Sequence, residues 1–404
     1  MVRNTRTVDW VVFHKMWQEI VLELLKGIGK IFINPLFYVA ILFAIILGYV
    51  RVKRERRFFR TRILWGWTET KRMIQDTWLL AVILSVLSII IGLTLTTEWI
   101  VTFSLISALL VVLFIFQLGS PVIAASLAIL ALGLGSEMGL SFTLLSKEWN
   151  GAANWLELAV PVALLIGAAV LIEGWLIRNT AAKSASPILE QSSRGLTAAG
   201  YLSKRLWLLP VLVVVPGNVI PDFLPYWPQF TLGNNSFGLL LLPIVIAFQQ
   251  KTRRTLPIYF YPKVGNAVMV VGIVTIILAV TAIWLPIFAA ISLAVGAVAR
   301  LGVWLYFAYH ERQGSHAVSP QDSGIMIAGV LPESPADKMG LKIGECIRKV
   351  NGQTVTNERE LYDAIQINAA HCRLEVLDHQ GEVRLRQHVI YHHDHHRLGL
   401  LVVR

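Results

Sequence analysis

The sequence predicts a polytopic α-helical membrane domain followed by a small α+β domain. Of its 404 residues, 55% are hydrophobic and 15% are charged, whereas soluble domains carry about 25% charged residues. Up to position 309, the apolar residues occur in blocks of about 20, the length at which a helix crosses the hydrocarbon core of a bilayer. These features exclude an ordinary cytosolic enzyme, and the 2 cysteines exclude a disulfide-stabilised scaffold.

The charged residues are distributed unequally on the two sides of position 309. Residues 1–309 hold 25 Lys and Arg against 13 Asp and Glu, whereas residues 310–404 hold 11 against 12. The formal charge of +11 therefore belongs to the membrane part. Basic residues there indicate topology and contact with anionic lipid, so we expect no nucleic-acid binding. We interpret residues 310–322 as a linker between the two parts.

The membrane part predicts a series of helical spans. Residues 1–30 place apolar side chains at helical spacing among several charges, which predicts an amphipathic interfacial helix. Residues 31–309 then predict a membrane domain with about nine transmembrane helices. The blocks at 206–220 and 236–250 are short and interrupted by proline, so they fit a pair of tilted spans or one re-entrant unit. The remaining blocks are 31–50, 77–95, 98–117, 121–141, 155–177, 264–283 and 285–309.

Loop charges predict the orientation of these spans in a cell membrane. Lys and Arg concentrate in 51–76, 178–205 and 251–263, whereas the intervening loops are almost free of them. Because basic loops are retained on the cytoplasmic side, the alternation places the C-terminal domain in the cytoplasm. It also places the N-terminus outside, although several basic residues near that end argue for the opposite side.

Ionisable residues within the predicted spans are candidates for function, because a charge in lipid is costly. Glu173 and Arg300 fall in the cytoplasmic halves of their spans, so they could form an intramembrane ion pair. We favour a structural pair or snorkelling towards the interface over a transport or relay role. Glu157 is the other such residue. The membrane part holds a single histidine, His14, which argues against a zinc peptidase or a histidine-dependent serine peptidase. We therefore expect no enzyme, no catalytic residue and no cofactor.

Residues 323–404 predict a different architecture. A strand at 324–331 leads into a short helix that Ser334 caps and Pro335 opens, and Asn351-Gly352 predicts a hairpin turn. A second helix is expected from Glu358 to about residue 367, because Asn357 and Glu360 have capping-box spacing. Two strands follow, at 374–377 and 382–386.

This order of elements resembles a PDZ domain over about 80 residues. The resemblance rests on Gly324-Ile-Met-Ile, Val330-Leu-Pro-Glu-Ser-Pro-Ala336, Gly340-Leu-Lys-Ile-Gly-Glu345 and Val350-Asn-Gly352. It implies a module that binds a partner peptide as an additional strand at a sheet edge. In such a module, a loop of backbone N–H groups holds the terminal carboxylate of the peptide.

The usual carboxylate-binding loop does not precede Gly324, so we expect a circularly permuted PDZ domain. The loop is then at Arg397–Leu400 and the docking strand at Leu400–Val403. The alternative is that residues 397–403 form only a closing strand. The predicted peptide-binding residues are Arg397, Leu398, Gly399, Leu400 and Val402 on one side and Leu361, Ala364 and Ile365 on the facing helix.

A histidine-rich run precedes this loop. His392, His393, His395 and His396 are weak candidates for metal ligands, because imidazole suits zinc and nickel. We favour a solvated loop without metal, since spacing alone does not define a coordination geometry.

Two N-terminal motifs extend the resemblance to the whole chain. Together with the PDZ segment, Phe32-Ile-Asn-Pro-Leu-Phe-Tyr38 and Gly48-Tyr-Val-Arg-Val-Lys-Arg-Glu-Arg56 resemble the MinJ family of cell-division topological determinants. The resemblance implies a membrane scaffold in division-site selection, enriched at septa and poles. It also implies partners: a DivIVA-type polar protein, the MinD-type ATPase that carries the inhibitor MinC, and other division proteins. The alternatives are a PDZ adaptor or regulator of a membrane protease and a transporter with a regulatory PDZ domain.

Overall fold

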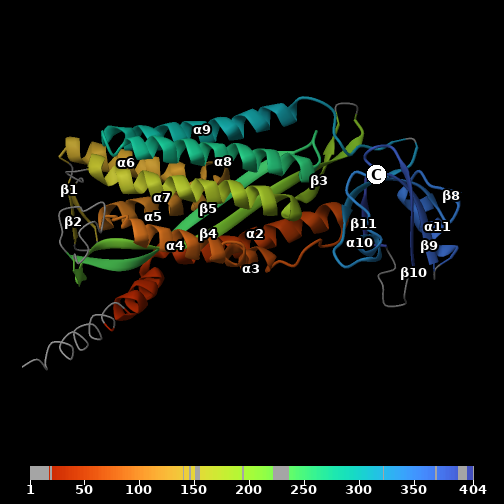
Figure 1. Cartoon of the computed structure of the whole chain (residues 1–404). Coiled ribbons are helices and arrows are strands. Elements are labelled where there is room, and N and C mark those ends of the chain that lie inside the picture. Colours follow the sequence, from red (N-terminus) through yellow and green to blue (C-terminus); the bar gives the residue numbers. More distant parts are fainter. Residues whose placement is uncertain are drawn as a thin grey trace, which may run out of the picture.

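The chain forms an elongated helical bundle with a small β-rich domain at one end (Figure 1). The computed structural model describes residues 18, 21–139, 141–144, 147–150, 155–192, 195–221, 236–321, 323–368, 371–389 and 398–403. Residues 21–29 are helical and lead into the turn η1 (Lys30–Ile33). The rest of the predicted interfacial helix lies outside the described residues, apart from position 18.

Within the described residues, five helices are long and apolar enough to cross a membrane by length and composition. Two further apolar helices, α5 (Thr97–Val112) and α6 (Pro121–Glu137), are shorter. The long ones are α2 (Pro35–Phe59), the segment Thr68–Ile91 with α3 (Thr68–Gln75) and α4 (Trp78–Ile91), the segment Trp155–Ser184 with α7 (Trp155–Leu176), α8 (Pro257–Thr281) and α9 (Ile287–Arg312).

The bundle presents apolar side chains on its outside. Ile90 of α4, Ile277 of α8 and Val298 of α9 are each more than half exposed, and many neighbours on the same helices are also exposed. Such extensive apolar surface is unusual in soluble proteins and is expected where helices face lipid. The helical membrane part of the prediction is therefore confirmed.

The prediction of helical spans at 206–220 and 236–250 is wrong, because both blocks are strands. β4 (Thr197–Pro221) pairs antiparallel with β5 (Ser236–Thr252) on one side and with β3 (Ser186–Gln191) on the other. The β4–β5 hairpin runs along the inside of the bundle (Figure 1). A strand buried on both faces reads as a continuous apolar run, which periodicity cannot distinguish from a buried helix.

The two faces of β4 enter different parts of the core. Trp207, Leu209 and Val211 pack in the cluster formed with α7 and α8. Leu206 and Leu208 face the opposite way and pack with α2. The bundle therefore encloses the hairpin from both sides.

The outer edge of β4 is paired with groups from α4 and from the loop that follows it. The hydroxyl of Ser85 accepts the N–H of Leu212 at 2.9 Å, and the N–H of Leu95 donates to the carbonyl of Val214 at 2.9 Å. An unpaired backbone N–H or carbonyl group in hydrocarbon raises the free energy of the folded state by roughly several kcal/mol. The hairpin is thus stable inside the bundle only with its edge covered.

Glu173 of α7 and Arg300 of α9 lie together in the bundle interior. The Glu173 Oε1 atom accepts from Nε and Nη2 of Arg300 at 2.9 and 2.8 Å. The Ser120 hydroxyl donates to the other carboxylate oxygen at 2.5 Å. Glu173 is 0% and Arg300 2% exposed, so each charge is buried with its partner. Glu157, by contrast, is exposed in the first turn of α7.

The C-terminal domain is built on a sheet with the order β10-β9-β7-β6-β11, and β8 pairs with β7. Its last strand, β11, lies beside its first, β6, in antiparallel register. This is the arrangement expected of a permuted domain. The elements are β6 (Ile325–Val330), α10 (Pro335–Lys338), β7 (Cys346–Val350), β8 (Gln353–Thr354), α11 (Glu358–Gln366), β9 (His371–Leu377), β10 (Val383–Val389) and β11 (Leu400–Val402).

The domain is docked on the end of β4 that leaves the bundle. Ala199 and Tyr201 of β4 pack against Met326, Ala328 and Val403 in one buried apolar cluster. The Tyr201 hydroxyl donates to the carbonyl of Ala328 at 2.9 Å. Burial raises the pKa of Tyr201, so its hydroxyl stays protonated and remains a donor.

The linker contributes to the same junction. The carbonyl of Val318 accepts the N–H of Ala199 at 2.9 Å, and the two residues form an antiparallel bridge. The predicted linker, 310–322, begins inside α9, which continues to Arg312. The junction is thus packed and hydrogen-bonded on the linker side as well as on β4.

Removing one member of the Glu173–Arg300 pair is expected to destabilise the protein. Arg300→Ala leaves an uncompensated buried carboxylate, which costs about 3–5 kcal/mol. The measurement is thermal unfolding of the full chain in detergent. The double variant Glu173→Leu/Arg300→Met is the control and should recover most of the lost stability. A single variant that unfolds at the wild-type temperature contradicts this role.

Removing the Tyr201 hydroxyl is expected to loosen the junction. Tyr201→Phe leaves the carbonyl of Ala328 buried without this donor, a loss of about 1–3 kcal/mol. Hydrogen exchange or limited proteolysis should show faster opening at residues 313–330. The control, Tyr259→Phe, removes a hydroxyl from an exposed tyrosine at the same end of the bundle. Equal opening in both variants argues against the bond as a junction contact.

Candidate peptide-binding site

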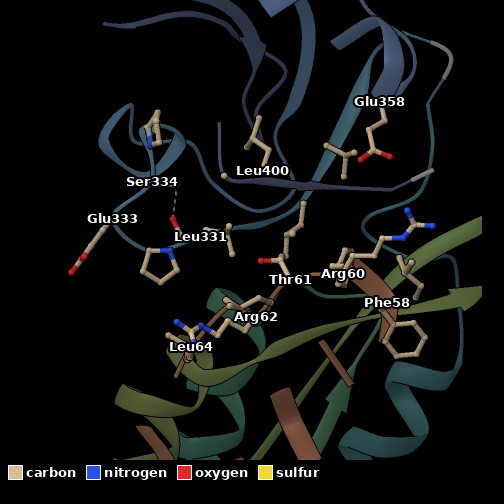
Figure 2. Close-up of a pocket in the computed structure, with 18 of the residues that line it drawn as sticks. Phe58, Arg60, Thr61, Arg62, Leu64, Leu331, Glu333, Ser334, Glu358 and Leu400 are labelled. Carbon is tan, nitrogen blue, oxygen red and sulfur yellow. Dashed lines mark hydrogen bonds between the residues drawn. The ribbon is translucent and has the colours of Figure 1, made fainter. Parts of the chain in front are cut away.

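A cavity of about 700 Å³ lies where the C-terminal domain meets the membrane part. One wall is formed by β11 with the loop before it, and a second by α11. The third wall is the segment 58–65, which comprises the last two residues of α2 and the loop after it and belongs to the membrane part. Figure 2 shows Leu400 of β11 above Arg60, Thr61 and Arg62 of this segment.

The outer edge of β11 borders the cavity. The strand pairs with β6 on one side and is the last in the sheet order. Leu331 donates its N–H to the carbonyl of Gly399 at 2.8 Å, and Val403 donates to Met326 at 3.4 Å. Because backbone groups alternate along a strand, those of Leu400 and Val402 point away from β6. An extended peptide could therefore pair with them.

The loop before β11 is anchored to the start of α10. Gly399 has a φ of +79°, and a Cβ there would lie 2.2 Å from the Cβ of Ser334. The carbonyl of Leu398 accepts the N–H of Ala336 at 2.9 Å. Glycine is therefore required at this close approach, which holds Gly399 beside the cavity.

The predicted helix side of the groove is buried in the core of the domain. Leu361, Ala364 and Ile365 are 1%, 1% and 6% exposed and pack in the core of the domain. Glu358 and Tyr362 line the cavity instead. In an amphipathic helix, the residues at positions i, i+3 and i+4 face the core of the domain. The neighbouring face of α11 therefore lines the cavity.

Capping interactions hold α11 beside the groove. The Asn357 side chain accepts the N–H of Glu360 at 2.9 Å, and the Glu360 carboxylate accepts the N–H of Thr356 at 2.8 Å. The N–H and hydroxyl of Thr356 lower the pKa of Glu360 below its ordinary value. Glu360 thus stays ionised, and the start of the helix is well defined.

The membrane-side wall is held by buried charged side chains. Glu55 accepts the N–H of Ile63 at 2.8 Å, and Arg51 donates to the carbonyl of Trp65 at 2.9 Å. Arg51 and Glu55 also pair with each other at 3.1 Å. The guanidinium of Arg62 lies 3.9 Å from the centre of the Trp65 ring. The segment 58–65 is thereby fixed to the end of α2.

A further ion-pair network ties this wall to the hairpin. Arg51 contacts Glu69 at 3.1 Å, Glu69 contacts Arg205 of β4 at 2.8 Å, and Arg205 contacts Asp76 at 2.7 Å. Arg51, Glu69 and Arg205 are at most 5% exposed. The sequence pattern of this basic loop indicates topology and lipid contact, and does not predict the buried network. The i, i+4 spacing of Arg51 and Glu55 was the one sequence signal for a buried pair.

Several predicted site residues lie outside the described residues, namely Arg397, His392, His393, His395 and His396. In the part of the chain that the structure describes, no group of three or more His, Cys, Asp or Glu could hold a metal ion. Cys346 and Cys372 are buried and unpaired, and burial raises the pKa of the Cys372 thiol to about 11.

Comparison with known proteins is consistent with both parts of this architecture. Residues 326–377 match the PDZ domain family. The chain is 34% identical over 393 residues to the cell division topological determinant MinJ of Bacillus subtilis (strain 168), covering 95% of this chain and 96% of that protein. The chain belongs to the MinJ family. It is also 28% identical over 285 residues to the probable MinJ proteins of Lacticaseibacillus paracasei and Lacticaseibacillus casei (strain BD-II), covering 64% of this chain and 74% of each relative.

In this MinJ-family chain, the PDZ match ends before the strand that borders the cavity. It runs from β6 to the end of β9, so β10 and β11 lie beyond it. The groove edge is thus supplied by the chain's last described strand, which the match does not cover. Whether the predicted residues contact a peptide stays a prediction.

Removing one outward N–H from β11 is expected to weaken peptide binding. Val402→Pro deletes a donor on the free edge and leaves the bond of Val403 to β6, because proline is tolerated at such edge positions. We expect about a tenfold loss, the equivalent of one hydrogen bond of about 1.4 kcal/mol. The measurement is titration of the full chain in nanodiscs with peptides selected from a random C-terminal library.

Val402→Ala is the matched control for this test, since it trims the side chain and keeps the N–H. It should bind within about threefold of the wild type, a difference below one hydrogen bond. Equal binding by the proline variant and the wild type contradicts strand addition at β11.

Proposed function

We propose that this chain is a non-enzymatic membrane scaffold in bacterial division-site selection. It links a DivIVA-type protein at poles and septa to the MinD-type ATPase and its inhibitor MinC. The observation that carries the proposal is the match along 95% of the chain to a protein named as a cell division topological determinant. The PDZ groove supports it, because an open sheet edge can bind a partner segment.

The proposal places the PDZ domain and the groove in the cytoplasm. The basic segments 51–76, 178–205 and 251–263 include the ends of α2 and β5 and the start of β4. These ends lie at the same end of the bundle as the PDZ domain (Figure 1). Positively charged loops favour the cytoplasmic side and contact with anionic lipid. A groove at this end of the bundle would bind partners that lie close to the cytoplasmic membrane surface.

The transporter alternative loses its main support in the structure. Glu173 and Arg300 pair with each other, and Ser120 donates to the remaining carboxylate oxygen. A carboxylate satisfied in this way is suited to holding α7 against α9. The other alternative, a PDZ adaptor of a membrane protease, can be distinguished from the scaffold by partner capture.

Loss of the PDZ domain is expected to uncouple the scaffold from its partners. A chain truncated after Arg312 keeps the described membrane helices but lacks the groove. Cells with this variant should mislocalise the MinD-type ATPase and grow as filaments or minicells. The measurement is fluorescence microscopy of the tagged ATPase, with the full chain as control.

Partner capture from the same two strains separates the proposals. Crosslinking should recover division proteins with the full chain and few with the truncated one. Recovery of peptidase clients instead would favour the protease adaptor. Normal septum placement and ATPase localisation after complete deletion of the gene would contradict the scaffold.

A further inference from the structure

The groove of this chain has a wall that a free PDZ domain lacks. In an added strand, side chains alternate between the domain and the opposite side. In a free domain, the side chains on the opposite side would face solvent. Here they would face the segment 58–65, which lines the same cavity as β11. The membrane part therefore contributes to what the groove can bind.

This wall is cationic where it lines the cavity. Arg60 ends α2 in a left-handed conformation with a φ of 55°, and its N–H donates to the carbonyl of Arg56 at 3.0 Å. Arg60 and Arg62 are both exposed and both line the cavity. Among the described residues, neither guanidinium has a carboxylate within ion-pair distance. Two cations are thus available at a fixed position.

The acidic residues of the cavity lie on the other walls. Glu358 belongs to α11, and Glu333 belongs to the loop that precedes α10. In Figure 2 the Glu333 side chain extends away from the space between Leu400 and Thr61, whereas Glu358 lies on the same side of the view as Arg60. The basic residues that line the cavity thus belong to the membrane-side wall, and the acidic ones to the other walls.

We propose that the groove binds an extended peptide segment with acidic side chains at alternate positions. The peptide backbone pairs with the outer edge of β11, and the acidic side chains contact Arg60 and Arg62. Charge-assisted hydrogen bonds from guanidinium to carboxylate are among the stronger polar contacts. This inference rests on the proposed function, since it describes the partner segment that the scaffold recognises.

The buried network behind the wall makes this recognition specific. Glu55 and Arg51 hold the backbone of Ile63 and Trp65. The backbone of Arg60 and Arg62 is therefore held at a constant distance from β11. A wall whose backbone needs no reordering loses less conformational entropy on binding. Acidic residues at successive positions would point half of their charges toward α11, so alternation matters as much as charge.

The test uses the full chain in nanodiscs of neutral lipid. The probes are three fluorescein-labelled peptides of equal length that differ only at alternate positions, with glutamate, serine or lysine. Fluorescence anisotropy should show at least fivefold tighter binding of the glutamate peptide than of the lysine peptide. Arg60→Glu/Arg62→Glu should abolish or reverse this preference.

Lys53→Glu/Arg57→Glu is the matched control, because both side chains are exposed on α2 and neither lines the cavity. It changes the net charge equally and should leave the preference unchanged. Equal loss of preference in both variants would show a general field effect and overturn the inference.

Other outcomes separate this inference from the proposed function. If Val402→Pro weakened binding but the wild type showed no preference for the glutamate peptide, only the role of Arg60 and Arg62 would be overturned. No binding of any peptide by the wild type would contradict the groove itself. If reversal of the arginines changed only retention on vesicles of anionic phospholipid, these side chains would be lipid ligands and the inference would fail.

Discussion

The polar backbone of the β4–β5 hairpin is the constraint on which the rest of the structure depends. A hairpin enclosed in an apolar bundle has no water at its edges, so protein groups must pair with its N–H and carbonyl groups. The Thr77 hydroxyl donates to the carbonyl of Leu208 at 2.5 Å. The Tyr261 hydroxyl accepts the N–H of Ser203 at 3.0 Å and donates to Gln250 at 3.1 Å. These contacts define where the surrounding helices lie.

The same strand connects the bundle interior to the peptide-binding groove. Within the bundle, β4 packs on both faces; at its emerging end, Arg205 joins the ion pairs with Glu69 and Asp76. Four residues earlier, Tyr201 donates to Ala328 of the PDZ domain. One strand therefore positions both the membrane-side wall and the domain that faces it. The groove is a property of the two parts together, because neither supplies all of its walls.

Several features were predictable from local patterns. The long helices follow from apolar length, and the PDZ elements follow from their caps, turns and motifs. The Glu173–Arg300 contact follows from two opposite charges at similar depth in lipid, where an unpaired charge is costly. The cavity-lining face of α11 was not predictable in this way, because Leu361 and Ile365 mark only the stripe of the helix that packs in the core.

The sequence by itself determined the membrane class and the order of the PDZ elements, since these depend on composition and on short-range spacing. Membership of the MinJ family rests on similarity along 95% of the chain. Only the tertiary structure decided that 206–220 and 236–250 are paired strands and that the segment 58–65 faces β11. The reason is physical. An apolar run is equally compatible with a helix or with a strand buried on both faces. The choice depends on edge partners that are distant in sequence.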